Sequence, residues 1–220
     1  MKKEVLLIAY CVTISMLFAV APVSAANYTQ YFNFSSFENS LGGASYTMED
    51  FEGYSHGDNL NGVEFLPGVN VTSNMANITA WNSSGDTILF AYDSTTRQSG
   101  NAYYQINLTQ DYGAVCFDID AWYPTGYDGQ VDIFFRDSSS VNIPLTQVGS
   151  ESDPVFFGIV ADEFIDKIVW NEPPEIGGWG NEETGLDNIV ATNAVPIPGA
   201  VWLLASGLIS FAGFRKKFKA

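Results

Sequence analysis

The sequence predicts an all-β fold, a jelly-roll-like β-sandwich flanked by an N-terminal signal peptide and a C-terminal transmembrane helix. Three observations predict the sandwich. Short runs rich in Val, Ile, Phe, Tyr and Thr recur along residues 45–192, and clusters of Gly, Asn, Asp and Ser separate them. Many short strands at this spacing are typical of sandwiches. No amphipathic helical pattern of any length occurs before residue 195.

The strands are expected in one domain, because residues 26–194 number 169, enough for a single packed core. They are predicted near 45–52, 69–73, 76–81, 87–92, 102–109, 113–122, 130–136, 141–146, 155–160, 164–170 and 186–192. Residues 26–44 form a lead-in segment, whose aromatic residues suggest a strand on the sandwich edge. The sandwich proper is then expected over residues 45–194.

One hairpin is predicted from turn chemistry. Asp128-Gly129 follows the run 115–122 and precedes the run 130–135, and Asp-Gly is a strong signal for a tight turn between antiparallel strands. In the first run Val115, Phe117 and Ile119 alternate with polar residues, so one face is expected in the core. The strand tryptophans Trp81 and Trp170 are expected in the core as well.

The domain is strongly acidic. Residues 26–194 carry 24 acidic side chains and three basic ones, a formal net charge of −21. Such a surface repels phosphate backbones, which excludes nucleic acid as a partner, and it attracts divalent cations. Cys116 is the only cysteine left after removal of a signal peptide, so no intramolecular disulfide is expected, and a strand cysteine acts as a small hydrophobe.

The last 26 residues, 195–220, have a three-part pattern. Val195, Pro196 and Pro198 precede an apolar run that includes Trp202 and carries no charge up to Phe214. A helix over about 197–214 is long enough to approach the thickness of a bilayer's hydrocarbon core. A basic stop follows at once, and such a stop stays on the cytoplasmic side; it consists of Arg215, Lys216, Lys217 and Lys219.

This pattern resembles the C-terminal sorting signal of PEP-CTERM proteins, the exported substrates of exosortases. The sequence looks like the V-P-x-P-G-A-V-W-L-L variant and departs from the family's name at Ile197, where many members carry glutamate. The resemblance implies that an exosortase processes this tail after export. A plain single-span membrane anchor is the alternative.

The N-terminus has the pattern of a signal peptide over residues 1–25. Lys2 and Lys3 precede an apolar stretch, and small residues at Val23 and Ala25 fit cleavage by signal peptidase after Ala25 or one residue later. Basic residues at both ends keep both ends in the cytoplasm and leave the domain outside. We therefore expect an inner-membrane intermediate that becomes a cell-surface or extracellular protein.

The middle of the chain resembles the β-sandwich ectodomains that PEP-CTERM proteins often carry. The resemblance rests on Asp50-Phe51-Glu52-Gly53 near the start and on Gly185-Leu186-Asp187-Asn188-Ile189 near the end. Jelly-roll domains commonly hold a calcium ion between their first and last strands, and calcium prefers oxygen ligands. By this resemblance Glu52 and Asp187 are the candidate calcium ligands. The alternative is that Asp187 only starts the last strand.

Enzymatic interpretations are weak. The segment 53–57 matches the G-x-S-x-G motif of serine hydrolases, but the chain's only histidine, His56, lies inside the motif, so no second histidine can serve as base. A polar loop is expected there instead. The carboxylate pair Asp118 and Asp120 could suggest a glycosidase, but a solvated strand face is the simpler interpretation in so acidic a chain. We expect no enzymatic activity.

Loop aromatics suggest a second function. Trp179 lies between glycines, and Trp122, Tyr123 and Tyr127 precede the Asp128-Gly129 turn. Exposed aromatic rings on sandwich loops can stack on sugars, although such rings can also fold back over a sheet edge. The main expectation is thus a non-enzymatic surface or matrix protein processed by an exosortase. The alternatives are a carbohydrate-binding module and, last, a secreted hydrolase.

Overall fold

The structure is a computed structural model that describes residues 26–83, 85–93, 101–121, 129–145, 154–172 and 184–193. The predicted signal peptide and sorting signal lie outside these residues. Among the residues described, no helix combines the length and the apolar character needed to cross a membrane.

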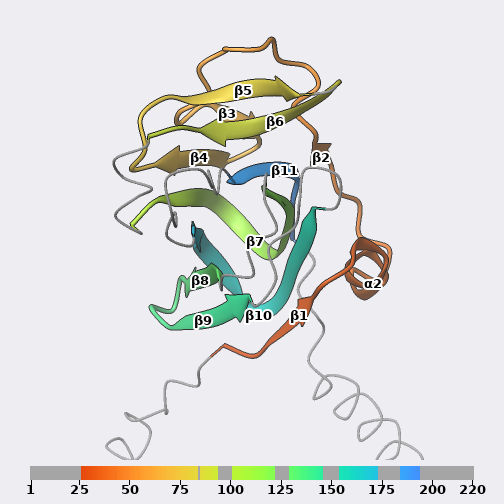
Figure 1. The fold of residues 1–220 in the computed structure, drawn as a ribbon. Helices are drawn as coiled ribbons and strands as arrows, with labels where there is room; N and C mark the ends of the chain where they lie inside the picture. The colour runs from red at the N-terminus through yellow and green to blue at the C-terminus, as the bar shows by residue number, and fades with distance from the viewer. Residues whose placement is uncertain are drawn as a thin grey trace, which may run out of the picture.

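The prediction of an all-β fold is confirmed. The described chain forms eleven antiparallel strands and one short helix (Figure 1). In chain order these are β1 (Tyr28–Tyr31), α2 (Phe34–Ser40), β2 (Met48–Glu49), β3 (Glu64–Leu66), β4 (Val69–Ser73), β5 (Ile78–Ser83), β6 (Asp86–Ala91), β7 (Tyr103–Ala121), β8 (Gly129–Phe135), β9 (Ser140–Leu145), β10 (Val155–Asn171) and β11 (Thr184–Thr192).

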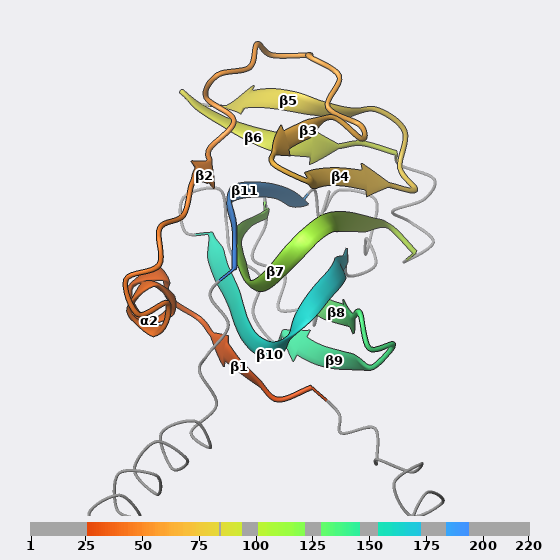
Figure 2. The same ribbon diagram turned by 180° about the vertical axis from the view of Figure 1, so that it is seen from behind.

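Two long strands, β7 and β10, build both layers of the fold. They pair with each other along their lengths, and each bends near its middle (Figure 2). The first half of β7 pairs with β4 and the second half with β11. One layer therefore has the order β5-β6-β11-β7-β10-β1, and the other has the order β3-β4-β7-β10-β8-β9. Four of the predicted short strands are in fact the halves of these two.

The core lies between the two layers. The core face predicted for β7 is confirmed, because Val115, Phe117 and Ile119 are completely buried there. The solvated face expected for Asp118 and Asp120 was wrong, because Asp120 is only 6% exposed and the opposite side of this half of β7 is covered. Trp170 is also buried, as predicted, and its indole N–H donates to the Thr184 hydroxyl at 3.1 Å. The Tyr104 hydroxyl donates to the Thr184 carbonyl at 2.6 Å. These two bonds satisfy the polar atoms of large core side chains and join the layers.

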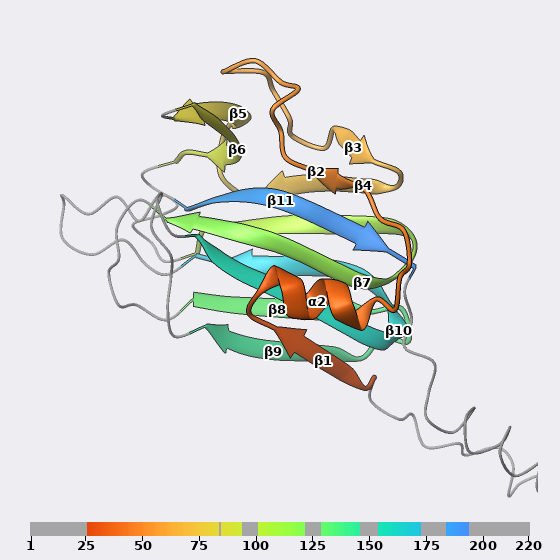
Figure 3. The same ribbon diagram turned by 90° about the vertical axis from the view of Figure 1, so that its right-hand side faces the viewer.

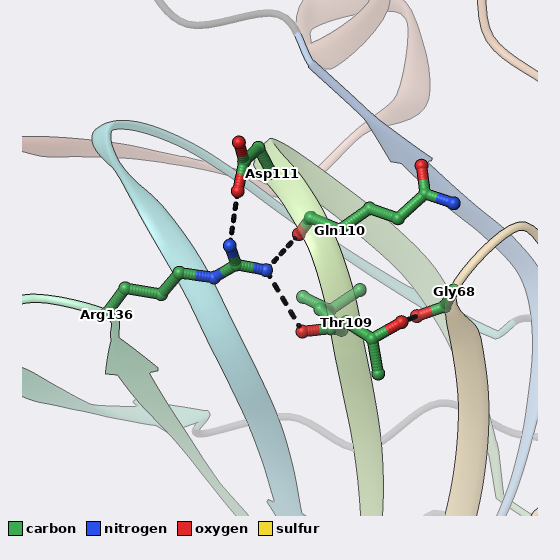
Figure 4. A network of polar contacts seen from close by, with 6 residues as sticks. Gly68, Thr109, Gln110, Asp111 and Arg136 are labelled. Atoms are coloured by element: carbon green, nitrogen blue, oxygen red, sulfur yellow. Dashed lines mark hydrogen bonds and ion pairs between the residues drawn. The ribbon is translucent and has the colours of Figure 1, made fainter.

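An arginine fixes the bend of β7. The Arg136 guanidinium, which follows β8, forms an ion pair with Asp111 and donates to the Gln110 carbonyl at 2.5 Å (Figure 4). The planar fork of arginine can bond a carboxylate and a carbonyl at once. Nearby, Thr109 donates through both its amide and its hydroxyl to the carbonyl of Gly68. The bend is therefore attached both to the turn between β3 and β4 and to the residue that follows β8.

The helix α2 was not predicted, and the expectation that no helix occurs before residue 195 was wrong. Asn33 caps it by accepting a hydrogen bond from the Ser36 amide at 2.9 Å. The buried Phe37 packs in a second apolar cluster on the outer face of the layer that contains β11, with Ala114, Cys116 and Val160 (Figure 3). Burial raises the pKa of the Cys116 thiol, consistent with an unreactive hydrophobe.

The predicted hairpin through Asp128-Gly129 was wrong. The strand β8 pairs with β10 and β9 and not with β7, so the connection over residues 122–128 joins two layers. Gly129 is needed for a different reason than a turn. A Cβ atom there would lie 1.9 Å from a ring carbon of Trp170, so only glycine lets this core tryptophan fit.

Both ends of the described domain leave at the same end of the sandwich. Thr192 is the register partner of Ala114, Ala114 of Val160, and Val160 of Thr29. Thr29 and Thr192 therefore lie in one row, three strand spacings or about 14 Å apart. Asn27, before β1, is held by two hydrogen bonds to the Asp162 carboxylate, at 2.8 and 2.7 Å. The lead-in residues thus begin the sheet, with β1 at its edge.

Candidate functional site

Most of the predicted site residues lie outside the part of the chain that the structure describes. The sorting residues Val195, Pro196, Pro198, Trp202 and Arg215–Lys217 lie outside the described residues, as do the loop aromatics Trp122, Tyr123, Tyr127 and Trp179. The candidate calcium ligands Glu52 and Asp187 are described.

Asp187 lies in an acidic cluster, which we define as Asp50, Glu52, Asp86, Asp118 and Asp187. Asp187 is only 7% exposed, and it is the register partner of Asp118 across β11 and β7. Asn188, which has a positive φ of 51°, lies between them. Its side-chain amide donates to Asp118 at 2.9 Å and to Asp187 at 3.2 Å. The last strand therefore departs from regular pairing where these carboxylates meet.

The side chain of Glu52 binds the start of β6. One carboxylate oxygen accepts from the Thr87 amide at 2.8 Å, and the side chain also hydrogen-bonds Asp86. Burial, followed by this bond, raises the pKa of Asp86. Asp86 thus lies close to both predicted ligands, since it hydrogen-bonds Glu52 and its charge raises the pKa of Asp187.

The electrostatics of the cluster favour a proton or a cation. Burial, together with the charges of Asp86, Asp118 and Asp50, raises the pKa of Asp187 to about 7, while the hydrogen bond from the Asn188 amide opposes the shift. Burial also raises the pKa of Asp118. Oxygen-only donors match the chemistry of calcium. Among the described residues, however, no three His, Cys, Asp or Glu side chains are arranged to hold a metal ion.

The strand ends that carry the loop aromatics meet at one end of the sandwich. Ala121, the last residue of β7, is the register partner of Thr184, the first residue of β11. Trp122 follows Ala121 directly, and Trp179 precedes Thr184 by five residues. Asn171 and Gln130, next to the same two connections, are partners across β10 and β8. The cross-strand pairing of Ala121 with Thr184 could not be read from the sequence.

The G-x-S-x-G segment is a loop, as predicted. The Ser55 amide donates to Asp58 at 2.8 Å, and turns follow the motif instead of a helix. His56 accepts from the Asn82 amide through Nδ1 at 3.2 Å, and its ring centroid lies 4.6 Å from that of Trp81. Trp81 is half-buried, so its expected place in the core was wrong.

A surface cavity of about 540 Å³ opens at the bend end of the sandwich. Residues 44–47, Leu66, Pro67, Gln110, Tyr112 and 191–193 line it. The Tyr112 hydroxyl donates to the Pro67 carbonyl at 2.5 Å, which fixes one wall. Among the described residues that line it, there is no carboxylate, histidine or cysteine.

Sequence reasoning missed a polar sheet face. We call it the amide face: the outward side of β4, β7, β10, β8 and β9, with the amides Asn70, Gln105, Asn107, Gln130, Asn142 and Asn171. The residues that alternate with them, such as Ile106, Val131 and Trp170, are buried in the core. The only signal in the sequence was polar alternation along each strand.

Comparison with known proteins gave structural neighbours only. No family model and no curated protein matches the chain. A family 29 carbohydrate-binding module from Piromyces equi has a TM-score of 0.38 at 15% identity, covering 68% of this chain and 90% of that one. A variant of a family 29 module complexed with mannohexaose has a TM-score of 0.38 at 14% identity, covering 70% and 94%. Similarity at this level assigns no function to the chain.

Proposed function

We propose that this chain is an exported, non-enzymatic surface or matrix protein whose C-terminal tail is processed by an exosortase. The observation that carries the proposal is the three-part pattern of residues 195–220, with Pro196 and Pro198, an uncharged apolar run and a basic stop. At the N-terminus, the apolar stretch and the small residues before Ala26 support export and cleavage by signal peptidase.

The arrangement of the domain is compatible with this route. The described strands begin at Tyr28, just after the expected cleavage site, and end at Thr192, three residues before Val195. Both ends leave the same side of the sandwich, about 14 Å apart by strand spacing. A domain of this kind can stand on a membrane while its opposite end, where Ala121 and Thr184 meet, faces away from the bilayer.

A C-terminal epitope tag tests the proposal. In a host that carries an exosortase, a tag after Ala220 should be present in the membrane intermediate and absent from the mature surface protein. Replacing Pro196 and Pro198 by alanine, with the apolar run and basic stop intact, should preserve the tag, because the variant keeps the anchor and loses the motif. A tag that persists equally on both surface proteins would make the tail a plain anchor.

The acidic cluster is proposed to hold calcium outside the cell. Its carboxylates are hard oxygen donors, and the buried Asp187 is repelled by Asp86, Asp118 and Asp50. A divalent cation would relieve this repulsion and would bind Asp187 in its ionised form. Glu52 would act at the edge of the cluster through its contact with Asp86.

A second candidate function is polysaccharide binding through the loop aromatics, favoured by the pairing of Ala121 with Thr184, which brings the two loop ends together. Removing a stacking aromatic usually costs a large share of binding energy. We therefore expect Trp179→Ala to weaken retention of the full chain on a neutral polysaccharide at least tenfold, with an unchanged melting temperature. A large loss of stability would identify Trp179 as a structural residue, and unchanged retention would remove it from any binding site.

A further inference from the structure

We propose that the amide face binds an uncharged polysaccharide laid across the strands β4, β7, β10, β8 and β9. This inference does not depend on the sorting of the chain, and it assigns the ligand to a surface that lies wholly within the described residues. The register of the strands, the hydrogen bonds around Asp132 and the charge of the face support it.

The register of the five strands arranges the outward side chains in rows. Lys167 is the partner of Asn107 on one side and of Phe134 on the other, and Val169 is the partner of Gln105 and Asp132. The rows continue onto β4 and β9. Five neighbouring strands span about 19 Å, so each row offers several contact positions to an extended chain.

One carboxylate organises the amides at the β9 side of the face. Asp132 accepts from the side-chain nitrogens of Gln130 at 2.9 and 3.0 Å, Asn142 at 2.6 Å and Asn171 at 2.7 Å. Each amide turns its nitrogen to Asp132, so its oxygen is directed away from the carboxylate and can accept from a ligand hydroxyl. Fixed side chains bind with less loss of conformational entropy.

A matching network holds the β4 side. Asn107 donates to Asn70 at 2.9 Å and to Thr72 at 3.2 Å, and it accepts from Gln105 at 2.5 Å. Amide and hydroxyl side chains can both donate and accept hydrogen bonds. Sugar hydroxyls do the same, so a polyhydroxylated chain is complementary to this surface at many points.

The charge of the face selects against charged partners. Residues 26–194 have a formal net charge of −21, yet Lys167 and Asp132 are the only charged residues in the three rows through Lys167, Val169 and Asn171. The rows are therefore neutral in an otherwise acidic domain. An anionic polymer would be repelled by the surrounding surface, whereas a neutral polymer would not.

The composition of the face also favours a polysaccharide over a protein. Protein interfaces depend on large aromatic or aliphatic anchors that enter pockets on the partner. Phe134 is covered instead by Lys167, whose Nζ lies 4.7 Å from the ring centroid. Hydrogen-bonding groups at regular strand spacing suit a repeating polymer of hydroxyls better.

Affinity electrophoresis tests this proposal on the full chain in mild detergent. Gels containing hydroxyethylcellulose or galactomannan should retard the protein, and gels containing alginate, which is anionic, should not. The double variant Gln130→Ala with Asn142→Ala should lower the affinity for the retarding polymer at least tenfold. Both side chains are exposed, so the melting temperature should stay unchanged. Gln30→Ala, an exposed amide on β1, is the matched control and should be retarded like the wild type.

Three results would overturn the proposal. The first is that neither neutral polymer retards the protein. The second is that wild type and double variant are retarded equally. The third is that the double variant sediments differently from the wild type, which would show that the face joins two copies of the chain. Retardation that Trp179→Ala abolishes and the double variant retains would place the ligand on the loops instead of the amide face.

Discussion

Gly129→Ala is expected to destabilise the domain by about 3 kcal/mol or more. The new Cβ would lie 1.9, 2.5 and 3.0 Å from three ring carbons of Trp170, which is 1% exposed. The indole cannot move away without losing its hydrogen bond to Thr184, which joins the two layers. Thermal or urea unfolding of the full chain in detergent measures the change.

Gly53→Ala is the matched control for this substitution. Gly53 has no atom within 4 Å of an added Cβ and no positive φ, so the same change should alter stability by less than about 0.5 kcal/mol. If Gly129→Ala unfolds at the same temperature as Gly53→Ala, the packing of Trp170 against β8 described above is wrong.

Asp187→Asn is expected to make stability less dependent on pH when calcium is removed by a chelator. The folded pKa of Asp187, about 7, lies above its ordinary value of 3.8, so the folded state favours the protonated carboxyl. Its stabilising contribution is complete below the ordinary pKa and is lost as the pH rises through 7. Between pH 5 and 8 the free energy of unfolding of the wild type should therefore fall by about 2 kcal/mol, and that of the variant should not show this fall.

Calcium should oppose this loss. An ion that binds only the folded state stabilises it by about 2.7 kcal/mol at a hundredfold excess over Kd. The wild type at pH 8 should therefore melt at a higher temperature in calcium than in chelator, and Asp187→Asn should show no such difference. Asp166→Asn removes the same charge from an exposed position on β10 and serves as the control. A wild-type melting temperature that calcium leaves unchanged would remove the metal site.

Strand positions and inward faces could be predicted because they depend on local pattern. The predicted run 69–73 is the strand β4, and the run 130–136 differs from β8 by one residue at each end. Alternation correctly assigned Phe117 and Ile119 to the core. These features follow from the two-residue period of a strand, which the sequence carries directly.

The pairing of strands could not be predicted, because it depends on contacts between distant residues. Asp128-Gly129 has the chemistry of a hairpin turn, but β10 lies between β7 and β8, and the close approach of Trp170 explains Gly129. The bends of β7 and β10 depend on contacts such as Arg136 with Asp111, which are 25 residues apart. The helix α2 has only seven residues, too few for periodicity to show.

The candidate sites also depend partly on local sequence and partly on long-range pairing. Glu52 and Asp187 came from a resemblance, and the structure adds Asp86 and Asp118, which bring them into one acidic cluster. The amide face could not be found from sequence, because Gln105, Gln130 and Asn171 come from three separate strands. Polar alternation in a single strand indicates only a solvated side, and the array forms through cross-strand register.

The intact mass of the protein purified from the surface of an exosortase-bearing host tests the central claim most directly. Export and processing predict a chain that begins at Ala26 or Asn27 and lacks Arg215–Ala220, so its mass should fall well below the 24.0 kDa of the full chain. A surface protein whose mass includes residues 215–220 would contradict processing by an exosortase. A mass that includes residues 1–25 would contradict cleavage by signal peptidase.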